Sequence, residues 1–226
     1  MKMKKNIENK ENGIMEVVFI LDRSGSMSGL ESDTIGGFNS TLKEQKQKKG
    51  NIIWSTILFD HEMEVIHDRM PIEQVKELTD KEYYVRGCTA LLDAVGTAIS
   101  HTAKVHKNTK KEFVPDKTLF VITTDGYENS SREYTYRKVK NMISHEQEKY
   151  GWEFIFLGAN IDAAKEAGRI GIMDSHAASY CNDSIGIQKN YAAVSCAMDL
   201  YEEKGCIDGS VLDEVRRDHA ARSKKN

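Results

Sequence analysis

Apolar residues occur along this chain mainly in short, almost uninterrupted runs of strand length. Four runs are rich in β-branched and aromatic residues and lack the alternation of a half-solvated strand: residues 16–21, 52–59, 118–123 and 152–157. Such runs are typical of strands covered on both faces, as in parallel sheets. Residues 63–70 alternate more clearly and end at Pro71, which predicts an edge strand paired as a hairpin with the strand before it. Residues 176–181 are a weaker sixth candidate.

Between these runs, apolar residues recur at the spacing of amphipathic helices. Stripes of this kind begin at Leu30, Leu92, Tyr136 and Ile187, and the last extends to Tyr201 over one long helix. Strands that alternate with such helices form right-handed βαβ crossovers. The sequence therefore predicts an α/β fold with a Rossmann-like, doubly wound and mostly parallel sheet that carries helices on both faces.

The composition is that of one soluble domain. The chain has 226 residues, of which 39% are hydrophobic and 30% charged. No apolar run approaches the roughly 18 residues of a membrane span, and the charged N-terminus does not resemble a secretory signal. The four cysteines include no CxxC pair and fit neither a zinc knuckle nor a dense disulfide framework. We therefore expect reduced thiols, a cytoplasmic location and no contact with a membrane.

The charge is distributed unevenly. The formal net charge is -3, but residues 1–10 carry +3 and residues 216–226 carry +4, so residues 11–215 carry -10. An acidic body argues against binding of nucleic acid, and the short basic ends are expected to be solvated. Neither of the glycine-rich phosphate-binding motifs, G-x-x-x-x-G-K-[ST] or G-x-G-x-x-G, is present.

Polar oxygen donors follow two of the predicted strands. Asp22, Ser24 and Ser26 come directly after strand 16–21, and Asp125 comes after strand 118–123. Ligands of open α/β sheets bind beyond the carboxyl ends of the strands, so these side chains face one another if the two strands are neighbours. Thr89 precedes the second helical stripe and is expected at a helix N-terminus.

These side chains predict a site for a hard divalent cation. Two carboxylates and three hydroxyls form an all-oxygen set without His or Cys, which suits Mg²⁺, or Mn²⁺ and Ca²⁺, better than zinc. Five side chains that give one oxygen each leave an octahedral shell incomplete, so waters and an outside ligand would complete it. Taken alone, the turn from Asp22 to Ser26 fits helix capping as well. The metal interpretation gains weight because Asp125 and Thr89 fall where a shared site needs them.

In three segments the chain resembles the metal-ion-dependent adhesion site (MIDAS) of von Willebrand factor type A (VWA) domains. These are Asp22-x-Ser24-Gly25-Ser26, then Gly87-Cys88-Thr89-Ala90-Leu91, then Thr123-Thr124-Asp125-Gly126, with spacings of 67 and 36 residues between Asp22, Thr89 and Asp125. The resemblance spans residues 14–205 and implies about six strands with one antiparallel edge strand. Residues 1–13 are then a basic N-terminal tail, and residues 206–226 a basic C-terminal tail or helix extension. Cys88 stands where the family often has a second glycine.

The resemblance also implies a role for each residue of the set. Side chains that match Ser24, Ser26 and Thr89 contact the metal directly in at least one state, and those that match Asp22 and Asp125 often act through water. An acidic side chain of a partner commonly supplies the last ligand. We therefore expect a non-enzymatic, Mg²⁺-dependent protein-interaction module of the bacterial intracellular type, an adaptor that captures an Asp or Glu of a protein partner.

One alternative function remains open from the sequence. Asp22 could serve as the nucleophile of a metal-dependent phosphatase or hydrolase built on the same sheet. Such an enzyme needs a second carboxylate two residues on, where Ser24 stands, and a lysine in the crevice, which is not evident. Glu128 lies close after Asp125 and is interpreted as an ordinary loop carboxylate. The sequence does not define the partner, the pathway or the oligomeric state.

Overall fold

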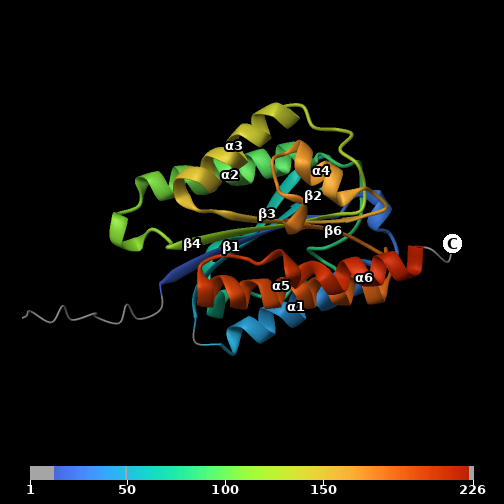
Figure 1. Ribbon diagram of the computed structural model, residues 1–226, viewed down its shortest axis with the longest axis horizontal. Helices are drawn as coiled ribbons and strands as arrows, with labels where there is room; N and C mark the ends of the chain where they lie inside the picture. Colours follow the sequence, from blue (N-terminus) through green and yellow to red (C-terminus); the bar gives the residue numbers. More distant parts are fainter. Residues whose placement is uncertain (1–12, 49, 224–226) are drawn as a thin grey trace, which may run out of the picture.

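The α/β fold predicted from the sequence is confirmed by the computed structural model, which describes residues 13–48 and 50–223. These residues form a six-stranded sheet with the order β3-β2-β1-β4-β5-β6, in which only β3 is antiparallel to its neighbour (Figure 1). The strands are β1 (Ile14–Asp22), β2 (Asn51–Phe59), β3 (Met63–Pro71), β4 (Lys117–Thr124), β5 (Glu153–Ala159) and β6 (Ala177–Tyr180). The antiparallel edge hairpin and the weaker sixth strand were both expected.

Two layers of helices cover the sheet. The helices are α1 (Glu31–Lys46), α2 (Leu91–Asn108), α3 (Tyr136–Tyr150), α4 (Ala163–Arg169), α5 (Ser184–Lys204) and α6 (Asp213–Arg222). Helices α2, α3 and α4 lie on one face, and α1, α5 and α6 lie on the other (Figure 1). The four predicted helical stripes correspond to α1, α2, α3 and α5, whose buried residues include the stripe positions Phe38, Ile99, Ile143 and Met198.

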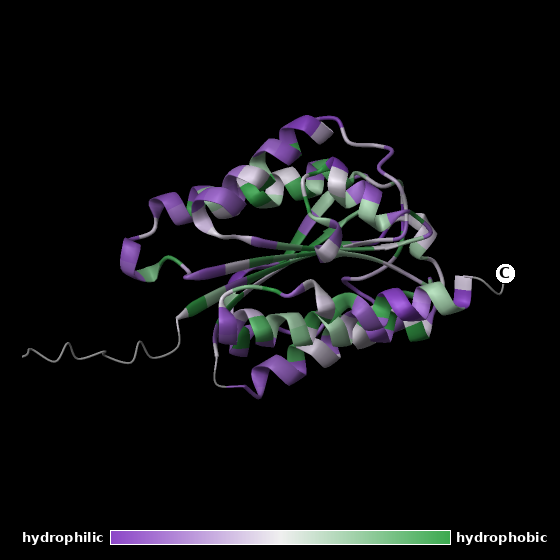
Figure 2. Cartoon of the chain, in the orientation of Figure 1, coloured by the Kyte–Doolittle hydropathy of each residue, from purple (hydrophilic) through white to green (hydrophobic). Residues whose placement is uncertain are grey.

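The strands have apolar residues on both faces because each face packs against a helical layer. In β1, Val17, Phe19 and Leu21 belong to the core shared with α1 and α5, whereas Val18 and Ile20 belong to the core shared with α2. Hydrophobic residues are accordingly concentrated in the sheet and on the inner sides of the helices (Figure 2). This two-sided burial explains why the strand sequences do not alternate.

The C-terminal region continues past α5 as a helix rather than as a tail, as far as residue 223. Leu212 and Val215 are buried, and Val215 lies in the core beneath α5. The Arg216 guanidinium donates to the carbonyl oxygens of Ser175 at 2.6 Å and Ala177 at 3.1 Å, which fastens α6 to the entry of β6. Of the predicted basic N-terminal tail, residues 1–12 lie outside the described part of the chain. The domain boundaries themselves stay a prediction.

Helix α4 was not predicted from the sequence, because its seven residues are too few to show a stripe of apolar positions. Its N-cap is Asp162, whose side chain accepts from the Lys165 N–H.

None of the helices in residues 13–48 and 50–223 combines the length and apolar character needed to cross a membrane.

Candidate metal centre

The carboxyl ends of β1 and β4 lie side by side at the point where the strand order reverses. Residues Leu21 and Thr123 pair across the two parallel strands, so Asp22 and Thr124 end their strands at the same edge. The Thr124 hydroxyl donates to Asp22 Oδ2 at 2.6 Å. Asp125, the next residue, is thereby placed next to Asp22, as the sequence analysis expected for neighbouring strands.

The loop after β1 brings both serines to the same place. The Ser24 N–H donates to Asp22 Oδ1 at 2.7 Å, and a short 3-10 turn over Gly25–Met27 follows. This turn sets the Ser24 and Ser26 hydroxyl oxygens 3.1 Å apart. The Ser26 hydroxyl then donates to Asp125 Oδ1 at 2.5 Å. Four of the five predicted ligands are therefore joined by one chain of hydrogen bonds.

Thr89 reaches the same cluster from a third loop. Gly126 has no side chain, and a Cβ at this position would lie 3.4 Å from Thr89 Oγ1 and 3.6 Å from Ser26 Oγ. The Gly25 N–H also donates to the Gly87 carbonyl at 3.2 Å, which ties the Thr89 loop to the serine turn. Thr89 lies two residues before α2, close to the predicted helix N-terminus. Thr89 therefore lies beside the hydrogen-bonded cluster of the other four predicted ligands.

Negative charge at this point is not compensated by any basic side chain of the described residues. Asp22 and Asp125 are 1% and 2% exposed, and their hydrogen-bond partners are hydroxyl, backbone or amide groups. Burial raises the pKa of Asp22 to about 6, although hydrogen bonds from Thr124 and Ser24 act in the opposite direction. Burial likewise raises the pKa of Asp125. Two carboxylates without a positive partner are an arrangement that a cation would stabilise.

Solved structures match this architecture, whereas no family model and no curated protein matches the sequence. The vWF domain of the pilus tip protein Mfa5 from Porphyromonas gingivalis aligns with a TM-score of 0.62 and 10% identity, over 87% of this chain and 99% of that chain. The PilB minor pilin of Streptococcus sanguinis gives 0.59 and 13% identity, over 87% of this chain and 64% of that one. This chain has the von Willebrand factor type A fold. The similarity extends to the fold alone, because the identities are low.

A third VWA structure of this kind is proximal thread matrix protein 1 of the mussel byssus, solved with a zinc-occupied MIDAS motif. Its TM-score is 0.53 at 14% identity, over 81% of this chain and 45% of that chain. The chain described here therefore spans less than two thirds of both the pilin and the byssus protein. The VWA resemblance inferred from the sequence is confirmed at the level of the fold, while metal binding by the five residues stays a prediction.

Two further residues belong to the same site, although the sequence analysis did not single them out. Thr124 holds Asp22 as described above and accepts from the Gly126 N–H at 3.3 Å. Asn182, just before α5, places its amide Nδ2 3.5 Å from Asp125 Oδ2. Thr124 could have been found from its position beside Asp125 at the end of a strand. No local signal identifies Asn182, because it reaches the site only through the position of β6.

Glu128 is more than an ordinary loop carboxylate, because it caps helix α2. Its Oε2 accepts from the Leu92 N–H at 2.9 Å, and its Oε1 accepts from the Ser130 and Ser131 N–H groups at 2.8 and 2.7 Å. The loop that follows Asp125 is thereby fastened to the beginning of α2, beside Thr89. A carboxylate at this place also complements the positive end of the helix dipole.

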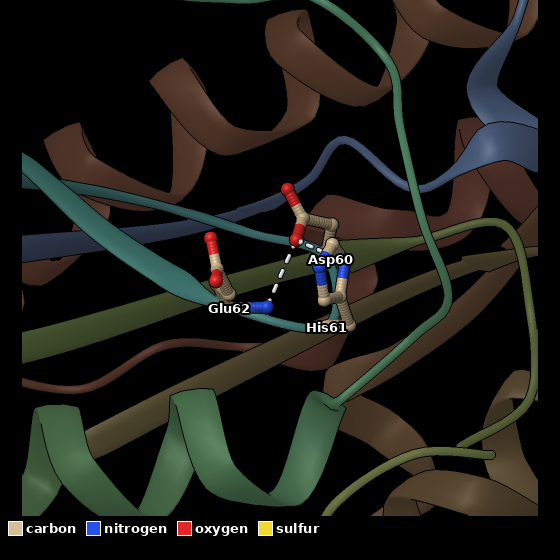
Figure 3. A group of neighbouring side chains, drawn as sticks. All are labelled: Asp60, His61 and Glu62. Atoms are coloured by element: carbon tan, nitrogen blue, oxygen red, sulfur yellow. Dashed lines mark hydrogen bonds and ion pairs between the residues drawn. The ribbon is translucent and has the colours of Figure 1, made fainter.

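A second group of possible metal ligands lies at the turn between β2 and β3. Asp60, His61 and Glu62 point toward one another there (Figure 3). Asp60 Oδ2, however, accepts from Arg23 Nε at 2.9 Å and from Arg86 Nε at 2.8 Å. Burial alone would raise the pKa of Asp60, but hydrogen bonds from the Glu62 N–H, Arg86 and Arg23 outweigh it and lower the pKa. The carboxylate is already neutralised, so this turn serves to hold the neighbouring loops in place.

Proposed function

We propose that this chain is a divalent-cation-dependent protein-binding module. The cation is held by Asp22, Ser24, Ser26, Thr89 and Asp125, with Mg²⁺ as the expected ion and Mn²⁺ or Ca²⁺ as the alternatives. The observation that carries the proposal is the pair of buried carboxylates, linked through hydroxyl groups and left without a basic partner among the described residues.

The residues present fit such an ion by their chemistry. Each of them offers a hard oxygen, and no His or Cys of the described chain lies in their hydrogen-bond network. A bound cation supplies the positive charge that the two carboxylates lack and a coordination position open to an outside oxygen ligand. The side chains of the site do the rest: Thr124 and the Ser24 N–H orient Asp22, and Ser26 orients Asp125.

The partner is a protein that presents an aspartate or glutamate. Residues 11–215 carry a net charge of -10, so the protein as a whole repels an acidic partner, and a bound cation would reverse the sign locally at this site. The zinc-occupied MIDAS motif of the byssus protein supports a divalent cation at this place in the fold. We further propose a cytoplasmic adaptor role, supported by four cysteines that are all free.

The module is proposed to be non-catalytic. Both Asp22 oxygens accept short hydrogen bonds and the residue is 1% exposed, so a phosphoester has little access to this carboxylate. Among the described residues, no lysine donates to Asp22 or Asp125. The alternative, a phosphatase that uses Asp22, is therefore less well supported than binding.

The test is capture of partners by immobilised protein with Mg²⁺ or with EDTA. We expect proteins that are retained only with Mg²⁺, that are lost from Thr89→Ala, and that are still retained by Glu62→Gln, a matched change at the β2–β3 turn. Amidation of the carboxyl groups in the applied mixture is expected to abolish retention as well. Identical eluates with Mg²⁺ and EDTA would contradict the proposal, and so would retention that survives amidation. Phosphate release from phosphoesters that depends on Asp22 would favour the enzyme.

A further inference from the structure

The candidate metal centre is open to solvent mainly at Ser26. Of the five candidate ligands, Ser26 is exposed, whereas the other four are buried: Asp22, Ser24, Thr89 and Asp125. A carboxylate that comes from outside must therefore approach the proposed ion past the Ser26 hydroxyl. The residues around Ser26 then decide which segments of a partner can come close enough.

One side of this opening is built from small residues. Gly25 and Gly87 are both exposed, and the Gly25 N–H donates to the Gly87 carbonyl at 3.2 Å. Ser28 and Gly29, which follow in the same loop, are exposed as well. Residues of this size let the backbone of a bound segment approach closely on this side.

Two large apolar side chains lie on the side of Asp125. A Cβ at Gly126 would lie 3.6 Å from Ser26 Oγ, so residue 126 borders the opening, and Tyr127 is its direct neighbour in the chain. Ile185 comes from the first turn of α5, shortly after Asn182, whose Nδ2 lies 3.5 Å from Asp125 Oδ2. Over this separation in the chain, the Cα atoms of residues 182 and 185 are at most about 11 Å apart. Both apolar residues therefore belong to segments that meet at Asp125.

Packing within the fold does not account for these two side chains. Tyr127 is 50% exposed and Ile185 is 54% exposed, and neither belongs to one of the two hydrophobic cores. Tyr84, which is also exposed, differs because its ring packs against the guanidinium groups of Arg23 and Arg86, at 5.2 and 5.7 Å. A single exposed apolar side chain is ordinary, but two that flank a site for an outside ligand favour contact with a partner.

We propose that the partner's aspartate or glutamate is flanked by large apolar residues, which pack against Tyr127 and Ile185 while the carboxylate binds the ion. The inference rests on the proposed function and specifies the chemistry of its partner. A cation attracts every carboxylate, so the apolar contact is what distinguishes one acidic segment from another. The net charge of -10 on residues 11–215 also disfavours a partner whose acidic residue stands in a cluster of acidic residues.

Calorimetric titration of the intact protein with two short peptides tests the inference. The leucine peptide is Gly-Ser-Leu-Asp-Leu-Ser-Gly with both ends blocked, so that the aspartate is its only carboxylate. The serine peptide has serine in place of both leucines. With Mg²⁺ we expect the leucine peptide to bind at least about tenfold more tightly than the serine peptide. We expect no binding of the leucine peptide with EDTA, or when asparagine replaces its aspartate.

A pair of double variants locates the apolar contact. Tyr127→Ser with Ile185→Ser is expected to bind the leucine peptide no more tightly than the serine peptide. Phe113→Ser with Met173→Ser is the matched control, because these side chains are 58% and 59% exposed and lie outside both hydrophobic cores. They precede β4 and β6, at the opposite end of the sheet from the candidate metal centre. The control is expected to keep the preference for the leucine peptide.

The possible results separate this inference from the proposed function. Equal Mg²⁺-dependent binding of the leucine and serine peptides would overturn the inference and leave the proposed function standing. A preference for the leucine peptide that survives Tyr127→Ser with Ile185→Ser would do the same, and so would the absence of binding of the leucine peptide. Binding that persists in EDTA, or that is equally tight with asparagine in the peptide, would instead contradict the proposed function itself.

Discussion

Replacement of Asp22 by asparagine removes one buried negative charge and keeps the size of the side chain, and its amide oxygen can still accept from the Ser24 N–H while its NH2 group faces the Thr124 hydroxyl. In the metal-free protein, burial raises the pKa of Asp22 from 3.8 to about 6. At 1.36 kcal/mol per pKa unit, this rise corresponds to about 3 kcal/mol. The cost is large enough to measure, because the total stability of a domain is about 5–15 kcal/mol.

The direction of the pH dependence follows from the raised pKa. Below pH 3.8 the Asp22 carboxyl is protonated in both the folded and the unfolded chain and does not penalise folding. As the pH rises through about 6 the folded chain must also carry the charge, so the favourable contribution that is present at low pH is lost. We therefore expect metal-free Asp22→Asn to be more stable than the unmodified protein above pH 6, by up to about 3 kcal/mol, and the difference to vanish at low pH.

Urea denaturation of both proteins at the two ends of this pH range, with EDTA and with Mg²⁺, measures the difference. Mg²⁺ at 100 times its dissociation constant is expected to add about 2.7 kcal/mol to the unmodified protein and much less to Asp22→Asn. Asp80→Asn, at an exposed position, is the control for a generic loss of charge. A metal-free Asp22→Asn protein that is less stable than the unmodified protein above pH 6, or an equal gain of both proteins from Mg²⁺, would contradict this prediction.

Three further substitutions test the elements that hold the site. Arg23→Met leaves the buried Asp60 carboxylate with one guanidinium partner fewer, so we expect urea denaturation to show a loss of about 3–5 kcal/mol in the free energy of unfolding. An unchanged denaturation midpoint would contradict this. Glu128→Ala removes the cap of α2, so we expect urea denaturation to show a loss of about 1–2 kcal/mol in the free energy of unfolding and calorimetry to show weaker Mg²⁺ binding. No change in either assay would exclude the capping role. Gly87→Ala is expected to lower the free energy of unfolding by about 1–3 kcal/mol, because φ is +68° and the new Cβ would lie 2.1 Å from His61 Nδ1. His61→Ala in the same chain is expected to relieve only the clash with the imidazole. Full rescue by His61→Ala would show that the backbone at residue 87 is not strained.

The fold could be predicted from the sequence because its strands are buried on both faces. Continuous apolar runs such as residues 118–123 are typical of strands covered on both faces, and β4 is buried against both helical layers. The edge hairpin could be predicted because β3 alternates and ends at a proline. Helix α4 could not, since its apolar contacts come from tertiary packing rather than from a periodic pattern of its own.

The proximity of the candidate ligands could be predicted in part. Asp22 and Asp125 end strands that become neighbours, so the rule for open α/β sheets brings them together before the structure is known. The support of the site could not be predicted in this way. Glu128 and Asn182 act through loops whose paths depend on the packing of α2 and β6, and no local sequence signal encodes those paths.

Asp22, Ser24, Ser26, Thr89 and Asp125 are proposed to bind one divalent cation together. The most direct measurement is the anomalous diffraction of Mn²⁺ in crystals of the protein. We expect one strong peak between the Ser24, Ser26 and Thr89 hydroxyl oxygens, absent from crystals of Asp22→Asn. A peak at Asp60, His61 and Glu62 instead, or no peak at Mn²⁺ concentrations that stabilise the protein, would contradict it.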